Sequence, residues 1–239
     1  MIGYANPKRF LDLTRPIPPW FFGVSSTLLA IGLYLALFVV PPERQQGDAV
    51  RIMFVHVPAA WIGMGAYALM AVCSIWALVN RHPLADIAAR EAAPLGALFT
   101  GLALITGSLW GKPMWGTYWA WDARLTSFLL LFFLYLGYIA IWNVTEDETR
   151  AARGAAILAI VGAVNLPIIK FSVDWWNTLH QGESIFRSGG PVIATVFLWP
   201  LFIMLAAYTT LFAALWIVRV RTAILRRTVR TRVSAGFGR

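Results

Sequence analysis

The sequence has little charge and one cysteine, and each shortage excludes a class of protein. Only 13% of its 239 residues are charged and 59% are hydrophobic, whereas soluble globular domains have about 25% charged and 45–50% apolar residues. The composition therefore indicates an integral membrane protein. The single cysteine, Cys73, cannot form an internal disulfide and has no partner thiol for a cysteine-based metal site.

The sequence contains six long apolar stretches. Each is about as long as a membrane-spanning helix requires, roughly 17–25 residues. They cover residues 20–40, 58–79, 94–110, 126–143, 154–171 and 191–217. None alternates apolar and polar residues with a period of two, which disfavours a β-barrel. We therefore predict an all-α integral membrane protein in which residues 1–239 form one domain of six transmembrane helices.

Two of these stretches have features that lead to further predictions. The first stretch is too long for the apolar part of a signal peptide and lacks a small-residue cleavage site, so we expect it to remain as an anchor. The fifth contains Pro167, which we expect to kink the helix.

Lysine and arginine are concentrated in the segments that lie on the same side as the two termini. Because these residues accumulate on the cytoplasmic side of membrane proteins, both termini are predicted to be cytoplasmic, and residues 41–57, 111–125 and 172–190 to form outward, periplasmic loops. Residues 218–239 form a basic cytoplasmic tail. Anionic lipid headgroups account for its charge without nucleic acid, and docking to a partner subunit is the alternative.

Two of the three histidines, His56 and His180, fall in the predicted outward loops. A neutral imidazole is a common ligand of iron, zinc and copper, but each histidine could equally cap a helix or bond a carbonyl. Zinc lacks a convincing third ligand: Asp122, Asp174 and Glu183 are available, but no zinc-binding spacing appears. Two imidazoles alone suit haem, because the porphyrin supplies the other four ligands.

The outward loop between these histidines is crowded with Trp115, Trp119 and Trp121. Tryptophans gather at membrane interfaces in general, but three in one short loop also form a surface for a large flat cofactor. If two axial histidines occupied the centres of both porphyrin faces, these rings would meet the periphery or edge of the macrocycle.

Charged residues of the same loop have competing interpretations. Lys112 and Arg124 could pair with the haem propionates, or Arg124 could bond Asp122 or a loop carbonyl. Asp122 is expected to hold the loop by accepting backbone N–H bonds in a turn.

The stretch "WGTYWAWDARLTS", residues 115–127, matches the signature W-G-x-x-W-x-W-D-x-R-L-T of the tryptophan-rich haem-handling membrane proteins of cytochrome c biogenesis. Together with "VHVPAAW" around His56 and "WWNTLHQG" around His180, it makes the chain resemble the family of cytochrome c maturation protein C, the haem exporter C subunits. The resemblance covers nearly the whole chain.

The resemblance implies a function and a set of site residues. His56 and His180 would be the axial ligands of haem b, beside a periplasmic platform. That platform would comprise Trp115, Gly116, Trp119, Trp121, Asp122, Arg124, Leu125 and Thr126. The protein would sit in the bacterial inner membrane and present haem to a periplasmic haem chaperone, the E component. Its other partners would be an ATP-binding subunit, a second membrane subunit and a small single-span subunit of an ABC-type complex.

The resemblance does not imply an enzyme. The chain has no G-x-x-x-x-G-K-[ST] loop with which to hydrolyse ATP, and assistance of covalent haem attachment to the chaperone is the one chemical role left open. The related synthetase-type proteins carry more spans and histidines within the membrane. Here no histidine falls inside a predicted span, which argues against a transmembrane haem channel.

Two alternatives to haem presentation remain. A permease subunit of an ABC-type complex could move haem or a small solute, although polar residues in the predicted spans are few for a pathway. A purely structural subunit would use the tryptophans as an interfacial belt and the histidines as caps.

Overall fold

The computed structural model describes residues 6–236 except 181, 183–184 and 186–188. This part of the chain is helical, with one isolated β-bridge and no β-strand. In chain order the elements are α1 (Pro7–Thr14), α2 (Ile17–Tyr34), the π-helix η1 (Leu35–Val39), the 3₁₀-helix η2 (Asp48–Ile52), α3 (Met53–Asn80), α4 (Pro83–Trp115), α5 (Ala123–Val144), α6 (Glu148–Gly162), α7 (Asn165–Trp175) and α8 (Thr195–Gly236).

Six helical segments of the described chain are long and apolar enough to cross a membrane. They are Ile17–Val39, Asp48–Asn80, Pro83–Trp115, Ala123–Val144, Glu148–Trp175 and Thr195–Val229. The prediction of an all-α protein with six spans is therefore confirmed. The side of the membrane on which each end lies stays a prediction.

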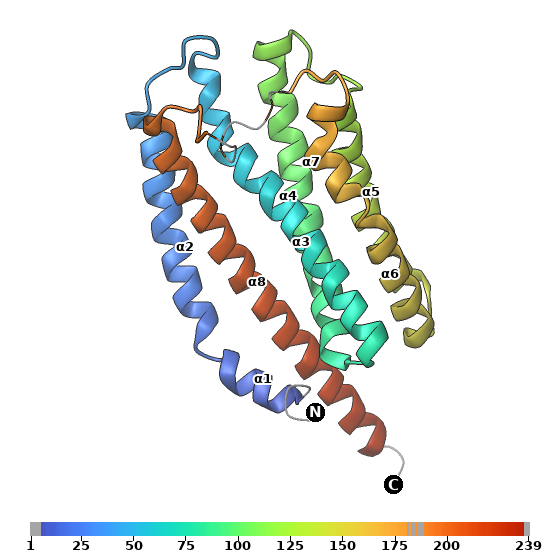
Figure 1. The fold of residues 1–239 in the computed structure, drawn as a ribbon. Helices are drawn as coiled ribbons and strands as arrows, with labels where there is room; N and C mark the ends of the chain where they lie inside the picture. The colour runs from blue at the N-terminus through green and yellow to red at the C-terminus, as the bar shows by residue number, and fades with distance from the viewer. Residues whose placement is uncertain (1–5, 181, 183–184, 186–188, 237–239) are drawn as a thin grey trace.

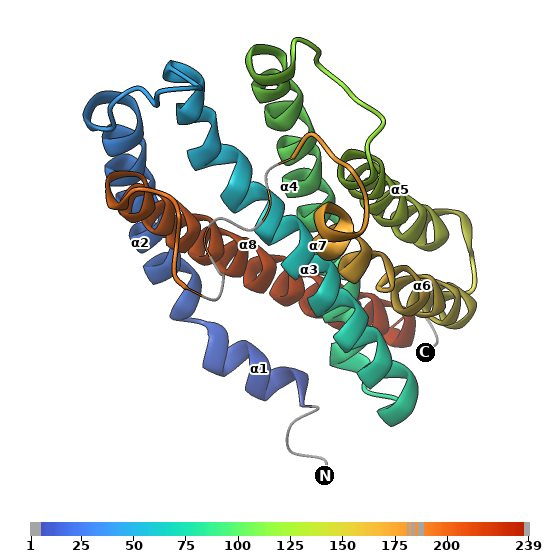
Figure 2. The ribbon, with the colours of Figure 1, turned by 45° about the horizontal axis from the view of Figure 1, so that its top comes forward.

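The helices form an elongated bundle with two distinct ends (Figure 1). Helix α2 packs against α8, while α3 packs against α4, α6 and α8. Helix α1 and the end of α8 lie at one end, called here the terminal end, with the short connections α3–α4 and α5–α6. The connections 40–47 and 116–122 and the described residues of 176–194 lie at the opposite end, the loop end. Figure 2 turns this end forward and shows the chain after α7 rising toward the end of α4.

Close approach of α3, α4 and α5 holds the bundle together near its centre. A side chain at Gly96 would collide with the ring of Tyr135, whose hydroxyl donates a 2.7 Å hydrogen bond to the carbonyl of Gly63. Small residues allow such contact between helices in a membrane, where dispersion and hydrogen bonds replace the hydrophobic effect. Tight packing near the centre of the bundle therefore fixes the helix ends that carry the loop-end connections.

The fifth span is interrupted, as expected from Pro167. Helix α6 ends at Gly162 and α7 begins at Asn165. Proline has no N–H, and its ring opposes the carbonyl four residues earlier, which here belongs to Ala163. The Asn165 side-chain amide donates a 2.8 Å hydrogen bond to the Ser127 carbonyl, which ties the interruption to α5.

The helices reach further into the predicted outward loops than the sequence suggested. Helical structure starts at Asp48, so residues 48–57 of the predicted loop 41–57 belong to η2 and α3. We expected Pro58 to start the second span, but it lies inside α3, where a proline is tolerated in transmembrane helices. His56 consequently lies on a helix and not in a loop.

The other two predicted loops are shortened in the same way. Helix α4 continues to Trp115 and α5 begins at Ala123, which leaves residues 116–122 of the predicted loop 111–125 as the connection. Helix α7 runs to Trp175, inside the predicted loop 172–190. The part of that predicted loop formed by residues 181, 183–184 and 186–188 lies outside the described residues.

Candidate functional site

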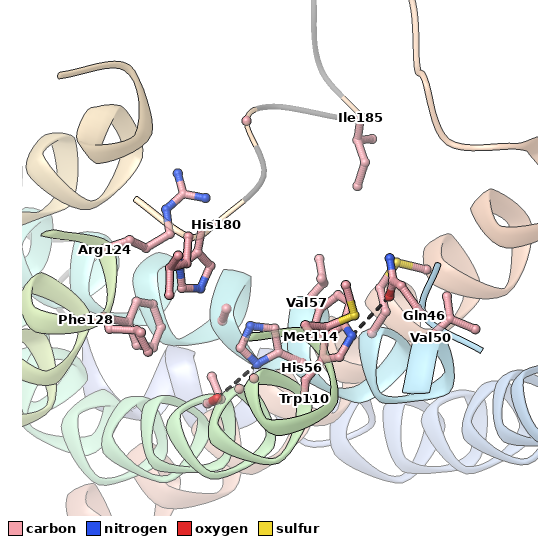
Figure 3. A pocket seen from close by; sticks show the side chains of 18 of the residues that line it. Gln46, Val50, His56, Val57, Trp110, Met114, Arg124, Phe128, His180 and Ile185 are labelled. Carbon is pink, nitrogen blue, oxygen red and sulfur yellow. Dashed lines mark hydrogen bonds between the residues drawn. The ribbon is translucent and has the colours of Figure 1, made fainter. Parts of the chain in front are cut away.

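A cavity of about 580 Å³ opens at the loop end of the bundle. This volume falls within the roughly 300–1,000 Å³ of typical small-molecule and cofactor sites. Its walls come from α3, α4, α7, the beginnings of α5 and α8, the connection around residues 43–46, and residues 179, 180, 182 and 185. His56 and His180 both line it, which brings together two residues that are far apart in the sequence (Figure 3).

His56 is oriented by the neighbouring helix α4. Its Nδ1 atom lies 2.9 Å from the carbonyl oxygen of Ala103 and 3.2 Å from the hydroxyl of Thr106. A carbonyl oxygen can only accept a hydrogen bond, so the ring proton is assigned to Nδ1. The Nε2 atom then keeps its lone pair and is available to a ligand.

Two further α4 residues shape the space around this ring. A Cβ atom at Gly107 would lie 2.8 Å from His56 Cε1, so glycine makes room for the imidazole. On the next turn, Trp110 meets His56 edge to face with ring centroids 5.6 Å apart. The indole Nε1 donates a 3.1 Å hydrogen bond to the Gln46 side chain, which fixes Trp110 against the first loop-end connection.

His180 is oriented by Asp122. Its Nδ1 lies 3.2 Å from Asp122 Oδ2, and the same oxygen accepts the backbone N–H of Leu179 at 3.2 Å. The other carboxylate oxygen caps α5 by accepting the N–H of Leu125 at 2.7 Å. The His180 ring also packs edge to face on Trp115, at 4.8 Å between centroids. The expectation that Asp122 holds the loop through backbone N–H bonds is met, and the carboxylate orients His180 as well.

The electrostatic surroundings favour a neutral His180. Burial lowers the pKa of its imidazole, and the hydrogen bond to Asp122 opposes this shift. The net direction is downward, so the ring is uncharged at neutral pH and can act as a metal ligand. With Nδ1 donating to a carboxylate, its Nε2 carries the lone pair.

The two imidazoles face each other across the cavity in Figure 3. Metal-binding histidines characteristically donate their second N–H to a carboxylate or a carbonyl, which fixes the ring and its tautomer. Both arrangements occur here. The residues therefore fit a metal centre approached by one imidazole from each side.

The donor set favours a metal that brings its own further ligands. Within the described residues, no three His, Cys, Asp or Glu side chains are placed to hold a metal ion together. Of the third ligands considered for zinc, Asp122 is engaged with His180, Asp174 is exposed on α7, and Glu183 lies outside the described residues. Haem, with four porphyrin nitrogens, matches such a site.

Only part of the tryptophan-rich stretch reaches the cavity. Trp115 lines it, whereas Trp119 and Trp121 pack against each other at 5.5 Å, and Trp121 is 76% exposed. Gly116 explains the separation: it ends α4 with φ of 76°, a left-handed conformation that favours glycine and turns the chain away. Thr126 is exposed on α5.

Of the remaining predicted residues, two line the cavity and one does not. Leu125 and Arg124 line the cavity. The Arg124 guanidinium donates to the carbonyls of Ile169 and Lys170 at 3.5 and 3.2 Å, which ties α5 to α7. Lys112 lies outside the cavity lining, where its ammonium donates to the Gly116 carbonyl at 3.0 Å.

Sequence reasoning missed the α4 wall of the cavity. Gly107, Trp110, Gly111 and Met114 all line it and follow the i, i+3, i+4, i+7 spacing of one helix face. The signal was present in the sequence, but the third span was predicted to end at Trp110, so the pattern was not traced across that boundary.

Known proteins match this chain over nearly its whole length. The sequence model of the Heme exporter protein C family matches residues 1–235. A heme exporter protein C from Bradyrhizobium diazoefficiens is 57% identical over 231 residues, 97% of this chain and 88% of the relative. The one from Escherichia coli K12 is 45% identical over 222 residues, 92% of this chain and 89% of the relative.

The similarity extends beyond bacteria. A putative cytochrome c biosynthesis ccmC-like mitochondrial protein of Marchantia polymorpha is 45% identical over 198 residues, 83% of this chain and 84% of the relative. Six membrane-spanning candidates, paired imidazoles at a cavity and these matches agree with one another. The chain belongs to the Heme exporter protein C family.

Proposed function

We propose that this protein binds haem b in the loop-end cavity through His56 and His180 and presents it to a periplasmic haem chaperone during cytochrome c biogenesis. One observation carries the proposal: two imidazoles face each other across a cavity, and each has its Nδ1 atom engaged and its Nε2 atom left for iron. Membership of the Heme exporter protein C family supports haem as the cargo.

The residues around the imidazoles suit an apolar macrocycle. Trp110, Met114 and Phe128 supply apolar surface inside the cavity, and Trp115 packs against His180. Haem held there supplies an iron that binds two imidazoles, while the protein orients both and excludes water from the buried part of the ring. Trp119 and Trp121, on the connection beyond Gly116, are then available to meet the haem edge or the docked chaperone.

The same proposal places the loop end in the periplasm and the termini in the cytoplasm, in agreement with the positive charge at the terminal end. Its partners are an ATP-binding subunit, a second membrane subunit and a small single-span subunit of an ABC-type complex. The chain lacks a nucleotide-binding loop, so ATP hydrolysis belongs to a partner, and no enzymatic step is assigned to this chain.

The test is an absorption spectrum of the purified protein, oxidised and reduced, for the wild type and three alanine variants. His56→Ala and His180→Ala should each remove the bands of bis-imidazole haem and weaken haem binding. His82→Ala is the matched control, because His82 accepts the N–H of Ala85 at 3.3 Å as the cap of α4. Unchanged axial-ligand bands in both site variants would refute the proposal.

A second assay separates presentation from transport. Haem should stay on the protein in sealed vesicles until the chaperone is added. Haem that crosses the membrane without an acceptor would favour a permease subunit instead.

A further inference from the structure

The two imidazoles of the site are held by supports of different kinds. His56 lies in the first turn of α3, a 28-residue helix that packs along α4. Its hydrogen-bond partner Ala103 is backbone of α4, and Gly107 and Trp110 of the same helix enclose the ring. Contacts between the two packed helices α3 and α4 therefore hold the His56 ring in position.

His180 belongs to a non-helical segment after α7. The Thr178 hydroxyl accepts the His180 N–H at 3.2 Å, but this bond stays within the segment. Within the described residues, the hydrogen bonds that tie residues 179 and 180 to another element both end on Asp122 Oδ2, and the His180 ring also packs edge to face on Trp115 of α4. The Asp122 side chain is only 7% exposed, so one buried carboxylate anchors the segment and the ring together.

We infer that His56 is the permanent axial ligand and His180 the exchangeable one, and that Asp122 is the positioning residue that decides whether His180 can bind iron. This inference rests on the proposed function. When the contacts to Asp122 break, the His180 ring is no longer held at the iron, and the haem stays on His56 with one face open to an acceptor.

Asp122 controls the proton of His180 as well as its position. While the carboxylate accepts from Nδ1, the Nε2 atom faces the cavity with a lone pair. An asparagine that keeps its carbonyl oxygen on the α5 cap would present its amide N–H₂ to Nδ1. The imidazole would then have to accept at Nδ1 and carry its proton on Nε2, where it blocks coordination; a wrong tautomer is the known consequence of such a substitution in an Asp–His pair.

The substitution Asp122→Asn separates this role from a merely structural one. Asparagine is as good a helix cap as aspartate, so the cap on Leu125 persists. The matched control is Asp147→Asn at the terminal end, where Asp147 caps α6 through the N–H groups of Thr149 and Arg150. Both variants change a helix cap in the same way, and only one of them touches a histidine.

The experiment uses the full-length protein in detergent, titrated with hemin, with the spectrum, the haem affinity and the thermal unfolding midpoint as readouts. Asp122→Asn and His180→Ala should both keep haem on His56 and shift it from low-spin to high-spin, and added imidazole should restore the low-spin bands. Each histidine variant should bind hemin at least about tenfold more weakly than the wild type, and His56→Ala should bind it more weakly than His180→Ala, because the imidazole that remains in His56→Ala lies on the non-helical segment. Asp147→Asn should give the wild-type spectrum, and Asp122→Asn should unfold at a lower temperature than Asp147→Asn because its amide also loses the bond from the backbone N–H of Leu179.

Two results would overturn the inference: a wild-type spectrum in Asp122→Asn, or His56→Ala that binds hemin as tightly as His180→Ala. Failure of the proposed function looks different, because both histidine variants would then keep the wild-type bands or the wild type would show none.

Discussion

The two ends of the bundle use the same residue types for different purposes. At the terminal end, His82 caps α4, Trp216 donates a 2.9 Å hydrogen bond to the Ala88 carbonyl, and Arg219 pairs with Glu91 at 2.9 Å. At the loop end, histidines and tryptophans surround a cavity of about 580 Å³. Each of the two imidazoles there has one nitrogen engaged and one directed at the cavity.

Residue type alone therefore does not distinguish the loop-end cavity from the rest of this chain. Trp142 at the terminal end stacks under the guanidinium of Arg90, 4.4 Å from the ring centroid, and does not line the cavity. The distinguishing property of the loop end is that two imidazoles, each oriented through its Nδ1 atom, line the same cavity. Imidazoles oriented in this way are typical of metal ligands.

The largest expected effect comes from Gly107, because it removes the space for the His56 ring. Gly107→Ala places a Cβ atom 2.8 Å from His56 Cε1, and we expect hemin affinity to fall by at least about tenfold, the lower end of the range for lost orientation of a metal ligand. Gly101→Ala on the same helix is the control, since its Cβ would lie 3.4 Å from Phe132, an ordinary contact. Equal hemin affinities in the two variants would show that Gly107 does not shape the site.

Arg124 should come next, since it ties α5 to α7 beside the cavity. Arg124→Lys and Arg124→Gln should both lower the free energy of unfolding by about 1–3 kcal/mol, because neither side chain can bond the carbonyls of Ile169 and Lys170 together with the Ser172 hydroxyl. Thermal unfolding measures the loss, and hemin titration tests the propionate alternative. Full recovery of hemin affinity by lysine alone would instead assign Arg124 to propionate binding.

Paired tryptophan substitutions at the two ends should have smaller and contrasting effects. Trp110→Phe loses the bond to Gln46, and Trp216→Phe loses the bond to the Ala88 carbonyl. Each should cost about 1 kcal/mol of stability. Only Trp110→Phe should also weaken hemin binding and shift its absorption bands, since Trp110 lines the cavity and contacts His56. A spectral shift in Trp216→Phe would show that hemin binding also depends on contacts at the terminal end.

The smallest effect is expected from Glu91→Gln. The Arg219 side chain of this ion pair is 41% exposed, and such pairs contribute at most about 1 kcal/mol. The unfolding midpoint should drop slightly, and hemin affinity should stay at the wild-type value. A measurable loss of hemin binding would mean that the terminal end communicates with the cavity.

Much of the fold was predictable, because spanning a membrane requires long apolar helices whose backbone bonds are satisfied internally. The six spans follow from that local requirement, and the interruption of the fifth follows from the missing N–H of Pro167. The ends of the helices were harder to predict: α4 continues past Trp110 to Trp115, and Pro58 lies inside α3 although it was expected to start the second span. As a result His56 was expected in a loop and was found on α3.

The candidate site was predictable in part from local motifs. The sequence contexts singled out His56 and His180, and both line the cavity together with Trp115, Arg124 and Leu125. Trp119 and Trp121 do not, because the left-handed turn at Gly116 directs the chain away. The importance of Gly107 could not be inferred from α4 alone, since it depends on how closely α3 approaches.

The membrane class and the number of spans could be read from the sequence, and so could the two candidate imidazoles, because apolar length and local motifs are properties of contiguous residues. Only the tertiary structure decided which nitrogen of each imidazole faces the cavity and which tryptophans reach it. Those properties depend on the approach of α3 to α4 and on the carboxylate that joins the start of α5 to the segment after α7. Such contacts link residues far apart in the chain, and no local pattern encodes their geometry.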